Sequence, residues 1–265
     1  MAFSRQELRL TKYRFLLAKF QLDYVLREQS LRGKRKALTS LPASESEAYE
    51  LIINRIKNGG TNTSDTAFRT LAWIFNAQRP LRMEELREAL LIGEGVQLEE
   101  IPADDYPPNE IVQICESLII HEEFSGIVRF SHTTVQDWLR ESKTYENLPP
   151  PADLAQTCLT YLASNVFSEP CLEKKALVKR LEMYKFSKYA VQFWGFHTRG
   201  DAETRGDIQD AVLQTFGSEL KRTSMLEIEE HKEYYNFKTG LTETLFHVVA
   251  KNGLGTICER LLEGR

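Results

Sequence analysis

Apolar residues recur at helical spacing along most of this chain. The first such run predicts an amphipathic helix over residues 5–30. A second run between Ser44 and Asn58 predicts another helix, because Asn58-Gly59-Gly60 is a typical stop signal. Neither helix can bury its apolar face alone, so both should pack on the rest of the chain or on another domain. The apolar positions of the first run are Leu8, Phe15, Leu16, Ala18, Leu22, Val25 and Leu26.

Residues 113–140 contain the most informative pattern in the chain. They predict a helix, a tight β-hairpin around Ser125-Gly126, and a second helix opened by Ser131 and His132. Gly126 can adopt the positive φ that such a turn requires.

Further helical patterns precede this segment. One begins with Asp65 as the expected N-cap, and another runs over Met83–Leu91 after the break at Pro80. A loop is expected over 93–108, with Asn109 capping the third helix. The order helix, helix, helix, β-hairpin, helix predicts a winged-helix domain.

The second half of the chain is predicted to be helical. Pro149-Pro150-Pro151 is typical of a stiff linker. The helices expected after it are Leu154–Leu162, Glu173–Met183, Phe186–Phe196 and Asp207–Phe216. Its aromatic cluster is expected in the core, and consists of Tyr184, Phe186, Tyr189, Phe193, Trp194 and Phe196.

The last segment follows the pattern with which ankyrin repeats begin. Thr244 to Ala250 places a histidine, His247, in a T-x-L-H-x-A-like context, and Gly253 and a second apolar run follow. One repeat cannot bury its own face, so further repeats are expected.

These patterns predict a mainly α fold with a small β-hairpin. We expect a helical arm, a winged-helix domain, a helical bundle and the start of an ankyrin repeat. The expected domain ranges are 1–62, 63–146, 152–236 and 240–265.

Charge and cysteine content narrow the class of protein. The net charge of −4 argues against a general nucleic-acid binder, although the first 36 residues are basic and residues 84–123 are acidic. The four cysteines lack metal-binding spacing, and Cys115 and Cys158 are expected to be buried thiols. With no apolar run long enough for a membrane span and no secretory signal, we expect a cytoplasmic protein.

Motifs for catalysis are missing from the sequence. It has no phosphate-binding G-x-x-x-x-G-K-S/T loop, no G-x-S-x-G nucleophile elbow and no H-E-x-x-H zinc motif. We therefore expect no enzyme activity, no metal and no cofactor held by this chain alone.

Two alternatives remain for the winged helix and for its histidine. DNA binding is the less favoured role, because Glu110 and Glu116 lie in the third helix and no Arg or Lys occurs between Arg87 and Arg129. His132 stands where a helix begins, so it could donate a hydrogen bond to a phosphate. It could equally cap the helix or pack against Trp138.

Four segments carry a resemblance to a known family. Residues 15–23 resemble the closing helix of a NACHT module, and 79–90 and 128–139 resemble the winged-helix domain labelled after the GPI inositol-deacylase. Residues 189–197 resemble the helical segment before an ankyrin array. The chain is thus similar to the region after the NACHT domain in fungal NACHT–ankyrin proteins, which are NOD-like-receptor relatives of the STAND class.

The resemblance implies a non-catalytic regulatory segment that couples a nucleotide switch to ankyrin repeats. His132, with Phe130 before it and Gln136 after it, falls on a histidine that contacts the β-phosphate of ADP in related receptors. ADP or ATP would bind only together with a NACHT domain, which this chain lacks. The implied partners are a NACHT domain, in cis or in trans, and other receptor copies. A stand-alone scaffold or adaptor without a nucleotide link is the alternative.

Overall fold

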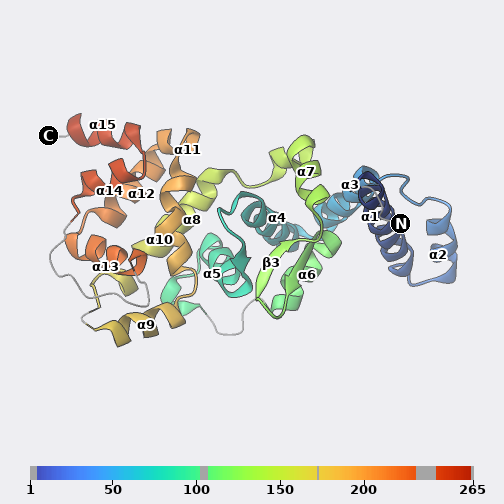
Figure 1. Ribbon diagram of the computed structural model, residues 1–265, viewed down its shortest axis with the longest axis horizontal. Coiled ribbons are helices and arrows are strands. Elements are labelled where there is room, and N and C mark those ends of the chain that lie inside the picture. The colour runs from blue at the N-terminus through green and yellow to red at the C-terminus, as the bar shows by residue number, and fades with distance from the viewer. Residues whose placement is uncertain (1–4, 102–106, 172, 231–242, 264–265) are drawn as a thin grey trace. The chain divides into compact units, whose positions relative to one another are not determined.

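Helices dominate the structure, and a three-stranded sheet accompanies them (Figure 1). The computed structural model describes residues 5–101, 107–171, 173–230 and 243–263. The chain divides into two compact units. The first unit comprises residues 1–67, 109–120 and 130–147; the second comprises 68–108, 121–129 and 148–265. The mainly helical fold with a small hairpin is confirmed.

Two helices, not one, occupy the beginning of the first unit. Helix α1 spans Arg5–Leu26 and helix α2 spans Leu31–Leu38, so the single helix expected over 5–30 is wrong at its end. Ser30 is the N-cap of α2: its backbone is extended, and its hydroxyl accepts a hydrogen bond from the Gly33 N–H at 2.9 Å. The side chains of Leu8 and Phe15 lie outside the described part.

Helix α3 (Glu45–Asn58) matches the expected helix at both ends. The Ser44 hydroxyl accepts a hydrogen bond from the Glu47 N–H, and the Glu47 carboxylate accepts one from the Ala43 N–H. Both of these backbone N–H groups at the start of the helix therefore have an acceptor. Gly59 follows the last turn. The buried face repeats at i, i+3, i+4 and i+7, as an amphipathic helix requires, and consists of Tyr49, Ile52, Ile53 and Ile56.

Helix α4 (Thr61–Asn76) begins earlier than expected. Asp65 is not its N-cap, because Gly60 with a φ of +100° stands directly before the first turn and its carbonyl accepts from the Ser64 N–H at 2.9 Å. Asp65 is an exposed residue inside the helix. The buried residues of α4 include Ala67, Leu71 and Trp73.

Helix α6 (Pro108–Ile114) is shorter than the predicted third helix. Asn109 lies inside its first turn and is not the cap. The helix ends at Ile114, because Glu116 adopts a left-handed φ of +53° and Glu116–Leu118 form a 3-10 turn. Helix α7 (Thr133–Glu141) begins where expected and buries Val135 and Leu139.

The hairpin is part of a small antiparallel sheet with the order β1-β3-β2. Strands β2 (Ile119–Glu122) and β3 (Ile127–Phe130) form the predicted hairpin, and Gly126 has the predicted positive φ, of +71°. Strand β1 (Leu81–Arg82) pairs with β3, with Leu81 opposite Val128. A strand of two residues is too short to show an alternation of apolar and polar positions, so β1 was not expected.

Helix α8 (Pro151–Ala163) is the centre of the second unit and packs against α5 (Met83–Gly93), α10 (Ser187–Thr198) and α12 (Gly206–Phe216). The Pro149–Pro151 linker is wrong at its last residue, because Pro151 is the first residue of α8, where its fixed φ suits a helix. The remaining helices are α9 (Lys174–Met183), α11 (Asp201–Thr204) and α13 (Glu219–Glu229).

Aromatic side chains form the core of this unit, as predicted. Phe186, Tyr189 and Trp194 are buried, whereas Phe196 is half exposed. The rings of Trp73 and Phe186 meet edge to face, with their centroids 5.3 Å apart. The buried members of the aromatic cluster therefore pack in the core of this unit.

Two short helices, α14 (Leu245–Lys251) and α15 (Gly255–Glu263), end the described chain. Thr244 caps α14, and its hydroxyl is 2.7 Å from Nδ1 of His247. The Asn252 side chain lies directly against Gly195 of α10: a Cβ built on Gly195 would be only 2.6 Å from the Cβ of Asn252. Part of 240–265 lies outside the described residues, and the ankyrin assignment stays a prediction.

Candidate functional site

His132 lies at the start of α7, where the sequence placed it. Strand β3 ends at Phe130, and the Ser131 N–H donates to the Leu118 carbonyl at 2.9 Å. The extended backbone of His132 then turns its ring toward the helix, and Nδ1 accepts from the Thr134 N–H at 3.3 Å. His132 is therefore the N-cap of α7, the structural role expected as one alternative.

The cap determines which ring nitrogen can donate. Because Nδ1 of His132 accepts a hydrogen bond, the proton of the neutral imidazole is on Nε2. Nδ1 is also 2.8 Å from Oγ1 of Thr134. A ligand such as a phosphate would therefore meet Nε2, while the helix-start N–H of Thr134 is already used by the ring.

Glu45, the first residue of α3, lies in the electrostatic field of His132. Burial raises the pKa of the Glu45 carboxyl, while the electrostatic interaction with the His132 ring and a hydrogen bond from Thr134 oppose that rise. Oε1 of Glu45 is buried and has no hydrogen-bond partner among the described residues. This carboxylate would repel a phosphate placed at His132.

The residues around His132 thus do not by themselves fit a nucleotide phosphate. A neutral His132 ring has a single N–H, and the Glu45 carboxyl interacts with the same ring. Binding of ADP here would require cationic groups and a phosphate-binding loop from another domain.

A network of side chains joins α3 to α7 next to this site. The hydroxyls of Tyr49 and Thr134 are 2.8 Å apart, and the Trp138 Nε1–H donates to the Ser46 hydroxyl at 3.0 Å. The rings of Tyr49 and Trp138 are 5.4 Å apart. Trp138 therefore packs on Tyr49, and the site is held between two capped helices.

The acidic residues of the third helix and of the hairpin are now placed. Glu116, at the end of α6, is 2.9 Å from Arg27 and 2.7 Å from Arg55. Glu110 is exposed on α6, and Glu122 in β2 pairs with Arg129 at 2.6 Å. Ion pairs with glutamates thus engage Arg27, Arg55 and Arg129.

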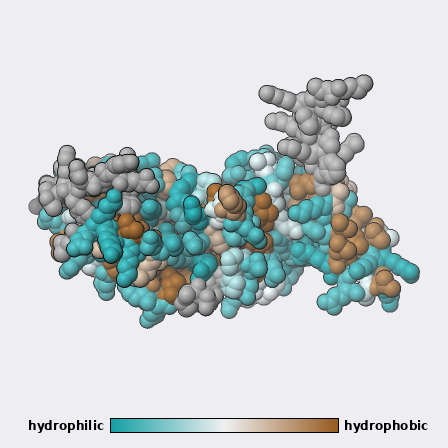
Figure 2. Space-filling view, turned by 60° about the horizontal axis from the view of Figure 1, so that its bottom comes forward, coloured by the Kyte–Doolittle hydropathy of each residue, from teal (hydrophilic) through white to brown (hydrophobic). Residues whose placement is uncertain are grey.

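Leucines are exposed on α1 and α2, and sequence reasoning recognised only those in α1. Leu22 and Leu26 of α1 are 57% and 58% exposed, and Leu31 and Leu38 of α2 are 78% and 58% exposed. Figure 2 shows hydrophobic residues gathered at the end of the first unit that carries these helices. Helix α2 also carries the basic run Arg32, Lys34, Arg35 and Lys36. Together we call this the leucine-basic surface.

The remaining candidate groups give no cluster. Cys115, Cys158 and Cys171 are buried, which confirms the expected burial of Cys115 and Cys158, and none of the four cysteines forms a disulfide. Within the described ranges, no group of His, Cys, Asp or Glu side chains has the arrangement of a metal site. No helix among these residues has both the length and the apolar character needed to cross a bilayer.

Sequence reasoning missed Glu88, a partly buried carboxylate in α5 of the second unit. It accepts hydrogen bonds from the Tyr161 hydroxyl at 2.6 Å and from the N–H groups of Lys185 and Phe186 at 3.0 and 2.9 Å. Its partners are separated from it by 73 to 98 residues in sequence. No local pattern could have identified it.

A comparison with known proteins supports one part of this description. Residues 55–147 match the family model described as GPI inositol-deacylase, winged helix domain. No curated protein and no solved structure matches the chain. The match confirms the expected winged-helix resemblance for this segment, and it transfers no deacylase chemistry.

Proposed function

We propose that this chain is a non-catalytic, protein-binding regulatory segment of a fungal, cytoplasmic NOD-like-receptor type protein. The observation that supports this proposal is the leucine-basic surface. Large apolar side chains exposed together, with charges around them, mark surfaces that bind other proteins.

The composition of this surface limits the partner. Leu22 and Leu31 would be buried by an apolar helix or groove, since burying a leucine side chain contributes about 2 kcal/mol. Arg32 and Lys36 favour acidic groups at the edge of that groove. A NACHT domain, in cis or in trans, or another receptor copy would provide such a surface.

The nucleotide link is the finer part of the proposal. His132 would contact the nucleotide only when a NACHT domain holds it, through the Nε2–H. Release of that contact would bias the winged helix between two packing states. The scaffold without a nucleotide link is favoured by one observation, the carboxylate of Glu45 beside His132.

The first experiment is to sequence the native transcript beyond both ends of these residues. An upstream phosphate-binding loop and downstream ankyrin repeats would support the receptor proposal. The encoded NACHT domain is then mixed with this chain, and association is measured by isothermal titration calorimetry with and without ADP.

Matched variants make this test specific. The double variant Leu22→Ser, Leu26→Ser should weaken association at least about tenfold, whereas Leu220→Ser, an equally exposed leucine of α13, should not. If both variants bind like the unsubstituted chain, the leucine-basic surface is not the interface.

His132→Ala separates the two versions of the proposal. Loss of the ADP dependence in this variant supports the nucleotide link. Association that never depends on ADP supports the scaffold. Tight duplex DNA binding that weakens steeply with salt would contradict both.

A further inference from the structure

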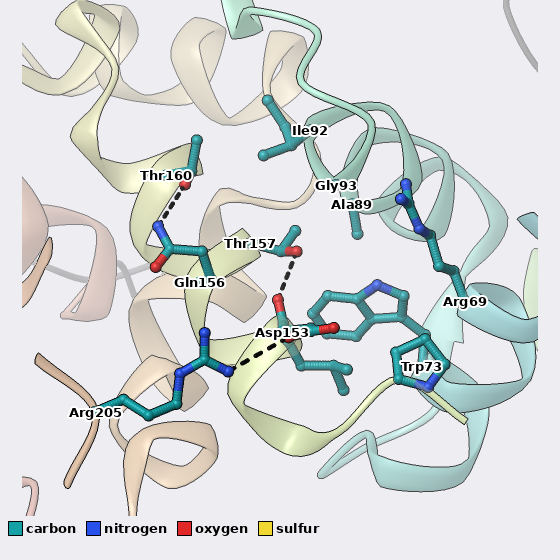
Figure 3. A pocket seen from close by; sticks show the side chains of 12 residues that line it. Arg69, Trp73, Ala89, Ile92, Gly93, Asp153, Gln156, Thr157, Thr160 and Arg205 are labelled. Atoms are coloured by element: carbon teal, nitrogen blue, oxygen red, sulfur yellow. Dashed lines mark hydrogen bonds and ion pairs between the residues drawn. The ribbon is translucent and has the colours of Figure 1, made fainter. Parts of the chain in front are cut away.

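The second unit contains a cavity of about 200 Å³ that none of the comparisons assigns to a ligand. Figure 3 shows it, with side chains from α4 and α5 on one side and from α8 on the other. Trp73, Ala89, Ile92 and Leu154 supply apolar walls, while Arg69 and Thr157 supply polar atoms. This combination of apolar walls with a few polar groups is typical of small-molecule sites.

Arg69 is the group in this cavity whose bonding is incomplete. Its Nη1 is buried and makes no hydrogen bond to any described residue. Nη1 of Arg69 forms a long ion pair with the Glu94 carboxylate, at 4.0 Å, which is beyond hydrogen-bond distance. Because a guanidinium stays charged in a protein, this buried N–H favours an anionic acceptor.

The Arg69 N–H lies close to Gly93, which lines the cavity. A Cβ built on Gly93 would be 3.7 Å from Nη1 of Arg69 and 3.6 Å from Oγ1 of Thr157. Gly93 has no side chain, so the space between these two groups stays open. The Thr157 hydroxyl already donates to the Asp153 carbonyl at 2.8 Å, so it has no proton left for an anion, and Arg69 is the donor on this side of the cavity.

The other cation at this cavity is already neutralised. The Arg205 guanidinium donates to Asp207 at 2.6 and 3.1 Å and is 3.7 Å from the Asp153 carboxylate. Arg69 has an ion pair but no hydrogen bond at Nη1, so it is the better anchor for an anion, and the Asp153 carboxylate disfavours a second negative charge on the ligand.

We propose that this cavity binds a small aromatic monocarboxylate. The carboxylate would accept from Arg69, because a planar guanidinium matches a planar carboxylate. The ring would lie against the apolar walls formed by Trp73, Ile92 and Ala89. A cavity of about 200 Å³ suits a ligand smaller than a drug molecule.

Benzoate is the probe, and benzamide is its neutral counterpart of the same shape. Each is titrated to about 10 mM, a range in which weak ligands are detected, while the indole N–H signal of Trp73 is followed by NMR. Benzoate should shift this signal saturably, and benzamide should bind at least about tenfold more weakly, since it lacks the charge-assisted bond to Arg69.

Three variants complete the test. Arg69→Gln should weaken benzoate binding about tenfold or more, and Gly93→Leu should abolish it by filling the cavity. Arg140→Gln removes an exposed arginine outside the cavity and should leave binding unchanged. Circular dichroism of each variant verifies its fold.

Equal shifts with benzoate and benzamide would overturn the proposal, as would unchanged benzoate binding in Arg69→Gln. Absence of any saturable shift with the unsubstituted protein would overturn it as well. Because Gly93→Leu keeps Arg69, it gives an independent answer if Arg69→Gln does not fold.

Discussion

The hydroxyl oxygens of Tyr49 and Thr134 are 2.8 Å apart, although 85 residues separate them in sequence. Tyr49 is buried in α3, and Thr134 lies in the first turn of α7 next to the capping ring of His132. This contact ties the position of the candidate histidine to a helix that lies far away in the sequence.

Tyr49→Phe should therefore lower the free energy of unfolding by about 1 kcal/mol, because it removes one buried hydrogen bond and little volume. Urea unfolding followed by circular dichroism measures this change. Tyr145→Phe is the control, since Tyr145 is 41% exposed, and its effect should stay within about 0.5 kcal/mol. Equal effects of the two variants would argue against a stabilising role of the Tyr49 hydroxyl.

Glu116 combines two opposing contributions that substitutions can separate. Its left-handed backbone is unfavourable for any side chain, whereas its ion pairs with Arg27 and Arg55 are favourable. Glu116→Gly and Glu116→Ala both lose the ion pairs, but glycine relieves the backbone. We expect the glycine variant to be more stable than the alanine variant by about 1 kcal/mol in urea unfolding. The reverse order would contradict the backbone conformation.

Glu88 should be one of the most sensitive positions of the second unit. Glu88→Ala leaves the Tyr161 hydroxyl and the N–H groups of Lys185 and Phe186 without an acceptor, so we expect a loss of about 3 kcal/mol. Glu88→Gln keeps an acceptor oxygen and the volume, so its loss should be smaller. Thermal and urea unfolding of both variants test this order.

The same carboxyl should give a pH dependence. Burial raises the pKa of Glu88 in the folded chain, despite its hydrogen bonds. The folded state then binds the proton more tightly than the unfolded state, so stability falls as pH rises through the carboxyl range. Glu88→Gln should remove this contribution, as urea midpoints at successive pH values would reveal. An unchanged pH profile in the variant would exclude the effect.

His197 should act in the opposite direction. It is 2% exposed, its Nε2 is 2.9 Å from the Tyr189 hydroxyl, and burial lowers its pKa to about 4. The unfolded histidine takes up a proton near pH 6.5, whereas the folded one stays neutral, so stability should be lost as pH falls from 6.5 toward 4. The full contribution would be about 3 kcal/mol.

NMR titration of the His197 ring protons measures this pKa directly. His197→Gln should flatten the decline of stability below pH 6.5 in urea unfolding. A ring that titrates near its ordinary pKa would contradict the burial described for it.

The sequence predicted elements whose signals are local. The Ser44 cap with its Asn-Gly end, the turn at Gly126 and the His132 start of α7 all depend on neighbouring residues. The predictions that failed concern elements that depend on distant residues or that are too short to show a pattern in the sequence. Glu116 has a left-handed backbone where its carboxylate pairs with Arg27 and Arg55, and β1 exists only because β3 pairs with it.

The sequence predicted the position of His132 but not the residues that surround it. His132 was placed at the helix start from the local pattern. Glu45 and Tyr49 come from a helix some 85 residues earlier. No spacing in the sequence predicts that they lie close to the start of α7. The Arg69 cavity likewise gathers residues from three helices.

The contact between Gly195 and Asn252 has a consequence for how this sequence can diverge. Any side chain at position 195 would collide with Asn252, whose amide N–H donates to the Val248 carbonyl at 2.8 Å. A larger residue at 195 is therefore tolerable only together with a smaller one at 252. Among related sequences the two positions should covary, and a C-terminal helix pair exchanged from another protein would have to satisfy the same steric rule.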